Sequence, residues 1–246
     1  MFKKRLNPLA VLIAVMLTTS TVHAMHIMEG FLPPQACIGW GIFCLPFLFL
    51  GVRTINRRLA ENPQAITILA MAGAFTFVLS ALKIPSVTGC SSHITGLGFA
   101  AMMFGPTVSC VLALIVLLFQ ALLLAHGGLT TLGANMFSMG IVGPIIAFLI
   151  YTSLCKTKVP RSITVFFAAA LGDLASYLST SLQLALVYPS EVGGISASFA
   201  KFVGIFAVTQ IPLAVIEGIL TVVLVNFIVE YGGGMVTSFG KEKTQP

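Results

Sequence analysis

The chain has 246 residues, of which 57% are apolar and only 8% are charged, and its mean hydropathy is +1.03. A soluble domain needs far more charge to cover its surface, so lipid is the predicted solvent for most of this chain. The net charge of +6 comes from small basic clusters between apolar runs. That placement is typical of membrane-protein loops and argues against a nucleic-acid partner.

The N-terminal segment, residues 1–24, is expected to be a cleaved signal peptide. A basic start at residues 3–5 precedes a short apolar core at residues 9–17, and Ala24 is the small residue expected before a cleavage position. The alternative is an uncleaved first helix. Cleavage would expose Met25 as a new N-terminus on the outer face of the membrane.

The remaining chain, residues 25–246, is expected to form one all-α transmembrane bundle, because no linker or internal repeat divides it. A spanning helix needs about 20 apolar residues. The long apolar runs lie near residues 35–53, 64–83, 107–125, 133–154, 163–187 and 199–229, and a shorter run lies near residues 94–104. The five cysteines include no CxxC pair and most lie in apolar stretches, so no disulfide framework is predicted.

The break at Gly105-Pro106 decides between seven membrane segments and six. With the mature N-terminus outside, seven crossings place nearly all basic loop residues inside, together with the C-terminus. Those residues are Arg53, Arg57, Arg58, Lys156, Lys158, Arg161, Lys241 and Lys243, whereas Lys83 and Lys201 fall outside. Merging residues 94–125 into one span instead places four of these ten basic residues inside and six outside. Seven segments are therefore favoured, with residues 94–104 as a tilted or half-buried helix.

The segment 25–30, Met-His-Ile-Met-Glu-Gly, contains the first candidate ligands. After cleavage, the Met25 amine, the His26 backbone nitrogen and the His26 ring would form two fused chelate rings around one metal. Nitrogen donors in a plane suit Ni(II), Cu(II) and low-spin Co(II), whereas Zn(II) prefers a tetrahedron. A fourth donor must come from elsewhere. Glu29 could attract cations to such a site or accept a hydrogen bond from His26.

Two other histidines follow in the mature chain, and both lie on the outer side in the predicted topology. His93 follows Ser91 and Ser92 in a segment of small residues, which let the backbone approach a ligand closely. Taken alone, His93 is more readily interpreted as a loop histidine held by hydrogen bonds than as a metal ligand. His126 is interpreted as structural or as part of an access path, and Asn135 as part of a polar lining that supports the ligands.

Three segments carry a resemblance to a known family. They are Met-His-Ile-Met-Glu-Gly-Phe-Leu-Pro from Met25, Lys-Ile-Pro-Ser-Val-Thr-Gly followed by Ser-His at His93, and Leu-Ala-His-Gly-Gly-Leu-Thr-Thr-Leu-Gly-Ala-Asn ending at Asn135. Together they resemble the CbiM/NikM family, most closely CbiM: the substrate-specific components of energy-coupling factor (ECF) transporters, which are ABC importers for cobalt and nickel. The resemblance implies a helical bundle that holds Co(II) or Ni(II), as transported substrate, through Met25, His26 and His93.

The resemblance also implies partners in the bacterial cytoplasmic (inner) membrane. They are an ECF transmembrane coupling subunit, cytoplasmic ATPase subunits and a small accessory membrane protein, and the imported cobalt would supply cobalamin biosynthesis. The chain itself has no GxxxxGK[ST] loop for phosphates. We therefore expect no enzymatic activity and no catalytic cofactor.

Two acidic residues inside apolar runs, Asp173 and Glu217, leave alternatives open, because a carboxylate is costly in lipid. Proton coupling would make the chain a secondary metal carrier. The favoured interpretation is hydrogen bonding between helices or contact with the coupling subunit. A membrane metalloenzyme is a third class, which the absence of HExxH disfavours. The donor set suits both Co(II) and Ni(II), so both metals stay open.

Overall fold

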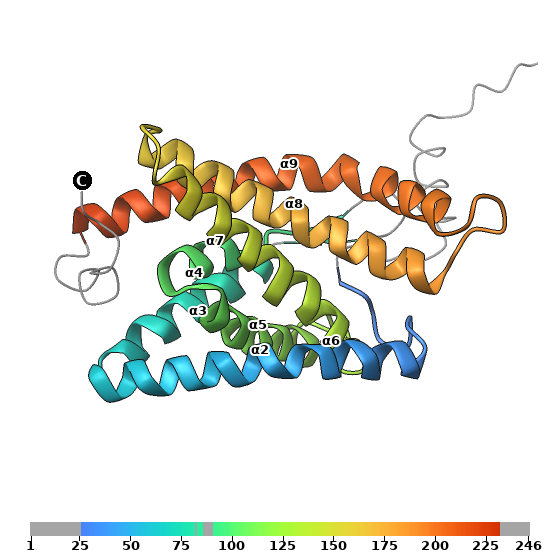
Figure 1. Ribbon diagram of the computed structural model, residues 1–246, viewed down its shortest axis with the longest axis horizontal. Coiled ribbons are helices and arrows are strands. Elements are labelled where there is room, and N and C mark those ends of the chain that lie inside the picture. The colour runs from blue at the N-terminus through green and yellow to red at the C-terminus, as the bar shows by residue number, and fades with distance from the viewer. Residues whose placement is uncertain (1–25, 82, 86–90, 232–246) are drawn as a thin grey trace, which may run out of the picture.

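The computed structural model describes residues 26–81, 83–85 and 91–231, and shows a bundle of helices packed along their lengths (Figure 1). The helices are α2 (Pro34–Glu61), α3 (Ala65–Ala81), α4 (Leu97–Phe104), α5 (Pro106–Leu123), α6 (Leu132–Asn135), the π-helix η1 (Met136–Val142), α7 (Gly143–Leu154), α8 (Arg161–Val187) and α9 (Gly194–Tyr231). Two short antiparallel strands, β1 (Lys83–Pro85) and β2 (Ser91–His93), interrupt the helices. The all-α prediction is confirmed, and the predicted signal peptide lies outside the described residues.

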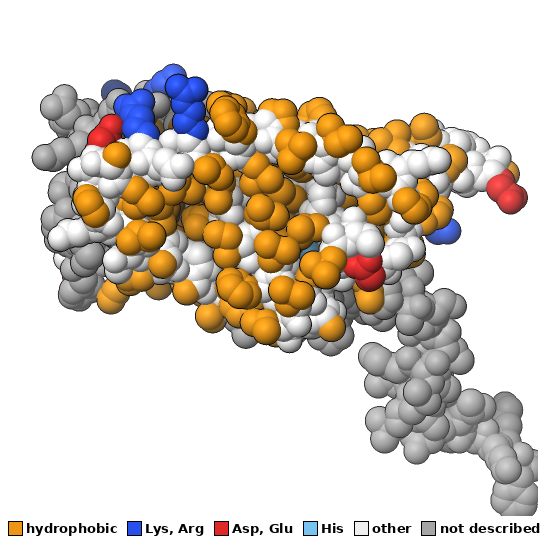
Figure 2. All heavy atoms as spheres, turned by 90° about the horizontal axis from the view of Figure 1, so that it is seen from below, with side chains coloured by type: hydrophobic (Ala, Val, Ile, Leu, Met, Phe, Trp, Pro, Cys, Tyr) orange, Lys and Arg blue, Asp and Glu red, His pale blue; other side chains and the backbone are white. Residues whose placement is uncertain are grey.

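The helices have the length and composition of membrane spans. In the part of the chain that the structure describes, five helices are long and apolar enough to cross a bilayer: α2, α5, α8, α9 and the continuous helix Leu132–Leu154, which comprises α6, η1 and α7. The apolar helix α3 is only slightly shorter. Large apolar side chains such as Ile38, Ile42 and Phe49 are exposed along α2, and orange hydrophobic atoms cover the face in Figure 2. Such a surface is stable only in lipid, so the protein is a multi-pass membrane protein.

The predicted break at Gly105 is confirmed. Helix α4 ends at Phe104 and α5 begins at Pro106, while Gly105 has a φ of 85° that favours glycine. Every residue of α4 except Met103 is buried. Eight residues extend only about 12 Å, far less than a hydrocarbon core of about 30 Å. Helix α4 is thus enclosed by protein, as expected for a short segment, and the count of seven crossings stays a prediction.

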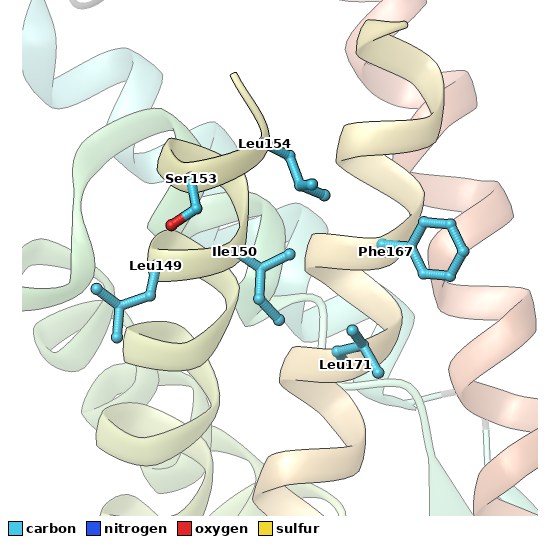
Figure 3. Close-up of a pocket in the computed structure, with 6 residues that line it drawn as sticks. All are labelled: Leu149, Ile150, Ser153, Leu154, Phe167 and Leu171. Carbon is cyan, nitrogen blue, oxygen red and sulfur yellow. The ribbon is translucent and has the colours of Figure 1, made fainter. Parts of the chain in front are cut away.

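Small residues bring α7 and α8 into close contact. A Cβ atom on Gly143 would lie 2.1 Å from Ser176 Oγ, and one on Gly172 would lie 2.8 Å from Ala147 Cβ. Small residues four apart on α8, namely Ala168, Gly172 and Ser176, permit this close approach. An apolar pocket of about 440 Å³ lies beside this contact (Figure 3), lined by Leu149, Ile150, Ser153, Leu154, Phe167 and Leu171.

The two ends of the bundle differ in charge. At one end of the molecule in Figure 1, helices α2 and α9 end and α7 connects to α8. We call this end the basic half. Its basic residues are Arg53, Arg57, Arg58, Lys156, Lys158 and Arg161. In the histidine half, where α2 begins and α8 connects to α9, Lys201 is the only basic side chain that the structure describes. This is the distribution that seven crossings require if the basic half faces the cytoplasm.

Candidate metal-binding site

The segment before α2, residues 26–33, enters the histidine half of the bundle. His26 and Ile27 are 1% and 2% exposed. Three hydrogen bonds hold the Ile27 backbone: its N–H donates to Asn135 Oδ1 at 2.8 Å, and its carbonyl accepts from Thr131 Oγ1 at 2.6 Å and from Asn135 Nδ2 at 3.0 Å. Since His26 directly precedes this clamped residue, its ring has a defined position.

Two glycines after α5 allow this docking. A Cβ atom on Gly127, which has a φ of 76°, would lie 3.2 Å from His26 Cδ2. One on Gly128 would lie 2.6 Å from the backbone nitrogen of Glu29. Only glycine lets the loop lie this close to the N-terminal segment. The same loop presents His126 to the interior, which explains why the Ala-His-Gly-Gly sequence suits this place.

Three histidine rings meet inside the bundle. His26 Nδ1 lies 2.7 Å from His93 Nε2, and their ring centroids are 4.6 Å apart. The centroid of His126 lies 4.4 Å from that of His26 and 4.9 Å from that of His93. One ligand atom of each ring lies within 4.8 Å of the other two, and all three residues are buried. Among the described residues, this is the group whose arrangement suits a metal ion.

The hydrogen bond made by His93 Nδ1 indicates which of the two ring nitrogens could bind a metal. His93 Nδ1 lies 2.9 Å from the carbonyl oxygen of Ile94. A carbonyl oxygen only accepts, so this contact assigns the proton to Nδ1 and leaves the lone pair on Nε2. Metal-binding histidines commonly donate their other N–H to a backbone carbonyl in this way. This Nε2 atom is the one that lies 2.7 Å from His26 Nδ1.

Glu29 lies at the surface above the site. Its carboxylate Oε2 accepts a hydrogen bond from the Thr130 N–H at 3.1 Å. Hydrogen bonds from the Thr130 hydroxyl and N–H lower the pKa of Glu29 from its ordinary value, because they stabilise the charged form. Glu29 is therefore a negative charge three residues after His26, and Thr130 orients its carboxylate.

The remaining predicted residues stand as follows. Met25 lies outside the described residues, and only the backbone of Ser91 and Ser92 is described, in strand β2. Asn135 supports the segment next to His26, as its interpretation as a supporting residue requires. The His126 ring contacts both other histidine rings, and a role in an access path alone does not require such close contact. Sequence reasoning gave it no ligand role, although its position after an apolar run was the available signal.

Comparisons with known proteins agree with the resemblance. The family model described as "Cobalt uptake substrate-specific transmembrane region", CbiM, matches residues 26–233. The "Cobalt transport protein CbiM" of Clostridioides difficile is 56% identical over 93% of this chain and 91% of its own length. That of Chlorobium limicola is also 56% identical, over 93% of this chain and 90% of its own. The chain belongs to the CbiM family.

Solved structures related to this CbiM-family chain show the same fold. One, described as "Crystal Structure of an Truncated Transition metal Transporter", has a TM-score of 0.74 at 24% identity and covers 84% of this chain and 99% of its own. A second, described as "Crystal Structure of an transition metal transporter", has the same TM-score at 23% identity and covers 89% of this chain. The predicted family and helical fold are thus confirmed.

Proposed function

We propose that this chain is the substrate-binding membrane subunit of an ECF-type ABC importer and captures Co(II) at the outer face of the bacterial cytoplasmic membrane. The observation that carries the proposal is the 2.7 Å contact between His26 Nδ1 and His93 Nε2 in a buried histidine cluster. Family membership supports cobalt as the cargo, because the relatives described above are named cobalt transport proteins. Imported Co(II) would supply cobalamin biosynthesis.

The histidine contact fits a planar chelate that begins at Met25. The amine of Met25, the backbone nitrogen of His26 and Nδ1 of its ring would occupy three corners of a square. The fourth corner lies opposite the backbone nitrogen and next to Nδ1. Neighbouring nitrogens in a square with metal bonds of ~2.0 Å are ~2.8 Å apart. His93 Nε2, at 2.7 Å from His26 Nδ1, has the separation expected for that corner.

The other residues of the histidine half would serve capture. His126 packs against both ligand rings and would guide the ion or support the ligands. The charged Glu29 would raise the local concentration of cations. Energy would come from separate ATPase subunits through an ECF coupling subunit, with a small accessory membrane protein as a further partner. Their contacts would lie on the basic half if it faces the cytoplasm.

The test combines metal content with transport. The protein, purified from a cobalt-supplemented culture, should begin at Met25 by mass spectrometry and hold about one Co(II) per chain, as expected for a single chelate. Cobalt uptake should require the co-expressed ATPase subunits. Uptake that depends on a proton gradient and not on the ATPases would instead support a secondary carrier. Competition with Ni(II) in the same binding assay decides between the two metals.

A further inference from the structure

One buried carboxylate lies next to the histidine cluster in space but far from it in sequence. Glu217, on α9, is fully buried. Its Oε2 accepts a hydrogen bond from the Thr95 N–H at 2.7 Å, and its Oε1 accepts from Thr95 Oγ1 at 2.8 Å and from the Gly96 N–H at 3.0 Å. Three donors converge on one carboxylate, and two of them are backbone groups that can only donate.

These donors belong to the turn that leaves His93. Ile94, which lies between His93 and Thr95, accepts the hydrogen bond of His93 Nδ1 through its carbonyl oxygen. It also packs with Leu79 and with Leu213 of α9. Leu213 lies one helical turn before Glu217, so the same face of α9 makes both contacts. The position of the Ile94 carbonyl, and with it the orientation of the His93 ring, therefore depends on the Glu217 carboxylate.

We propose that Glu217 is a positioning residue of the metal site, which acts through Thr95 and Gly96 on His93. This inference rests on the proposed function, because it assumes that His93 Nε2 is a metal ligand. Residues that orient a ligand histidine affect metal affinity nearly as much as the ligands do. A carboxylate suits the place, since a glutamine would direct its NH2 group at one of the three donors. Helix α9 thereby becomes part of the metal site.

A second buried carboxylate provides the matched control. Asp173, on α8, is buried to the same degree, and its Oδ2 accepts a hydrogen bond from Gln210 Nε2 of α9 at 2.8 Å. This is a contact between two helices and does not involve the turn after His93. Asp173→Asn therefore replaces a buried carboxyl group of the same helix pair without removing any of the three hydrogen bonds to the turn after His93.

The experiment is a Co(II) titration of the purified full-length mature protein. Glu217→Gln should raise the dissociation constant about 10-fold and shift the ligand-field absorption of bound Co(II), because the His93 nitrogen is misaligned. Asp173→Asn should change the dissociation constant less than about twofold. Thr95→Val removes one of the three hydrogen bonds without changing charge and should weaken binding in the same direction. It also serves as the second variant if Glu217→Gln does not fold.

A double variant separates positioning from general destabilisation. If Glu217 acts only through His93, adding Glu217→Gln to His93→Ala leaves the residual Co(II) binding unchanged. Wild-type affinity and absorption in the folded Glu217→Gln and Thr95→Val variants would overturn the proposal, as would additive losses in the double variant. If wild-type protein binds no Co(II), the proposed function fails as well. If wild type binds and His93→Ala does not, a normal Glu217→Gln refutes this inference alone.

Discussion

The two halves of the bundle differ in how many long-range buried hydrogen bonds accompany their apolar packing. The basic half has an apolar core, formed by Leu69, Ala72, Phe99, Ala100, Met102, Phe104, Val108, Leu112, Val165, Ala168, Ala169 and Val225. The histidine half has smaller apolar clusters, and there buried hydrogen bonds also connect segments far apart in the sequence, such as Ile27 with Asn135 and Thr95 with Glu217. Packing of small and apolar side chains is the general force between helices in lipid. Buried polar contacts are stabilising only when every group is paired.

This difference separates stability from metal binding. Apolar packing in the basic half sets how tightly the helices associate and specifies no ligand geometry. The hydrogen bonds of the histidine half hold the segments that carry His26 and His93. Substitutions in the basic half should therefore change melting temperature, and substitutions in the histidine half should change metal affinity.

The orientation of the two halves predicts an all-or-none difference in labelling. A cysteine in place of Lys158, in the basic half, should be protected from a membrane-impermeant reagent in intact cells. A cysteine in place of Glu191, in the connection between α8 and α9, should be labelled fully, because the histidine half is predicted to face outside. Permeabilised cells give the control. Labelling at position 158 in intact cells would refute the orientation and the seven-segment topology with it.

Blocking cleavage should abolish metal binding. In Ala24→Leu, Met25 would keep an amide nitrogen in place of its amine, and an amide cannot offer the same lone pair. A free α-amine has a pKa of ~7.7–8.0, so a metal can displace its proton near neutral pH. Co(II) retention by uncleaved and cleaved protein, purified in the same detergent, measures the effect. Equal affinity would exclude the amine, and the site would then have to consist of the three histidine side chains.

Removing His93 should weaken Co(II) binding more than about 100-fold, because it removes a ligand and not only a supporting group. His126→Ala should weaken binding about 10-fold or less, since its ring packs against the ligand rings. Both variants remove one buried imidazole, so each serves as the control for the other. The opposite order would make His126 the fourth donor and would leave His93 in a supporting role.

Sequence alone predicted the basic half better than the histidine half. Apolar runs record where lipid and packed helices surround the chain, so the helices and the break at Gly105 were predictable. The pairing of Glu217 with Thr95 joins residues 122 positions apart. Such contacts depend on how the closed bundle aligns α9 with the turn after β2, which no local pattern specifies. The π-helix directly after Asn135 was also missed, because the apolar run at residues 133–154 has the composition of an ordinary membrane helix.

Two glycine substitutions test the contrast between the halves directly. A Cβ atom on Gly51, in the basic half, would lie 2.3 Å from the Thr107 carbonyl oxygen. Gly51→Ala should therefore reduce the free energy of unfolding by about 1–3 kcal/mol and leave Co(II) affinity unchanged in the folded protein. Gly128→Ala, which displaces Glu29, should instead weaken Co(II) binding about 10-fold. Gly39→Ala is the control, because nothing lies within 4 Å of the added atom.

The smallest effect is expected at Glu29, which is exposed and is proposed to act on the incoming ion through its charge. Glu29→Gln should slow Co(II) association about twofold to threefold at low ionic strength and have no measurable effect in high salt, because screening removes the attraction of an exposed charge. Since Thr130 lowers the pKa of Glu29 below its ordinary value of 4.5, the carboxylate stays charged throughout the neutral and mildly acidic range. The difference between wild type and variant should then be the same at pH 6 and pH 8.

Stopped-flow mixing with Co(II) at two salt concentrations gives the rates. A slowing that persists in high salt would mean that the Glu29–Thr130 contact shapes the route to the histidines, and the long-range attraction proposed for this carboxylate would be wrong.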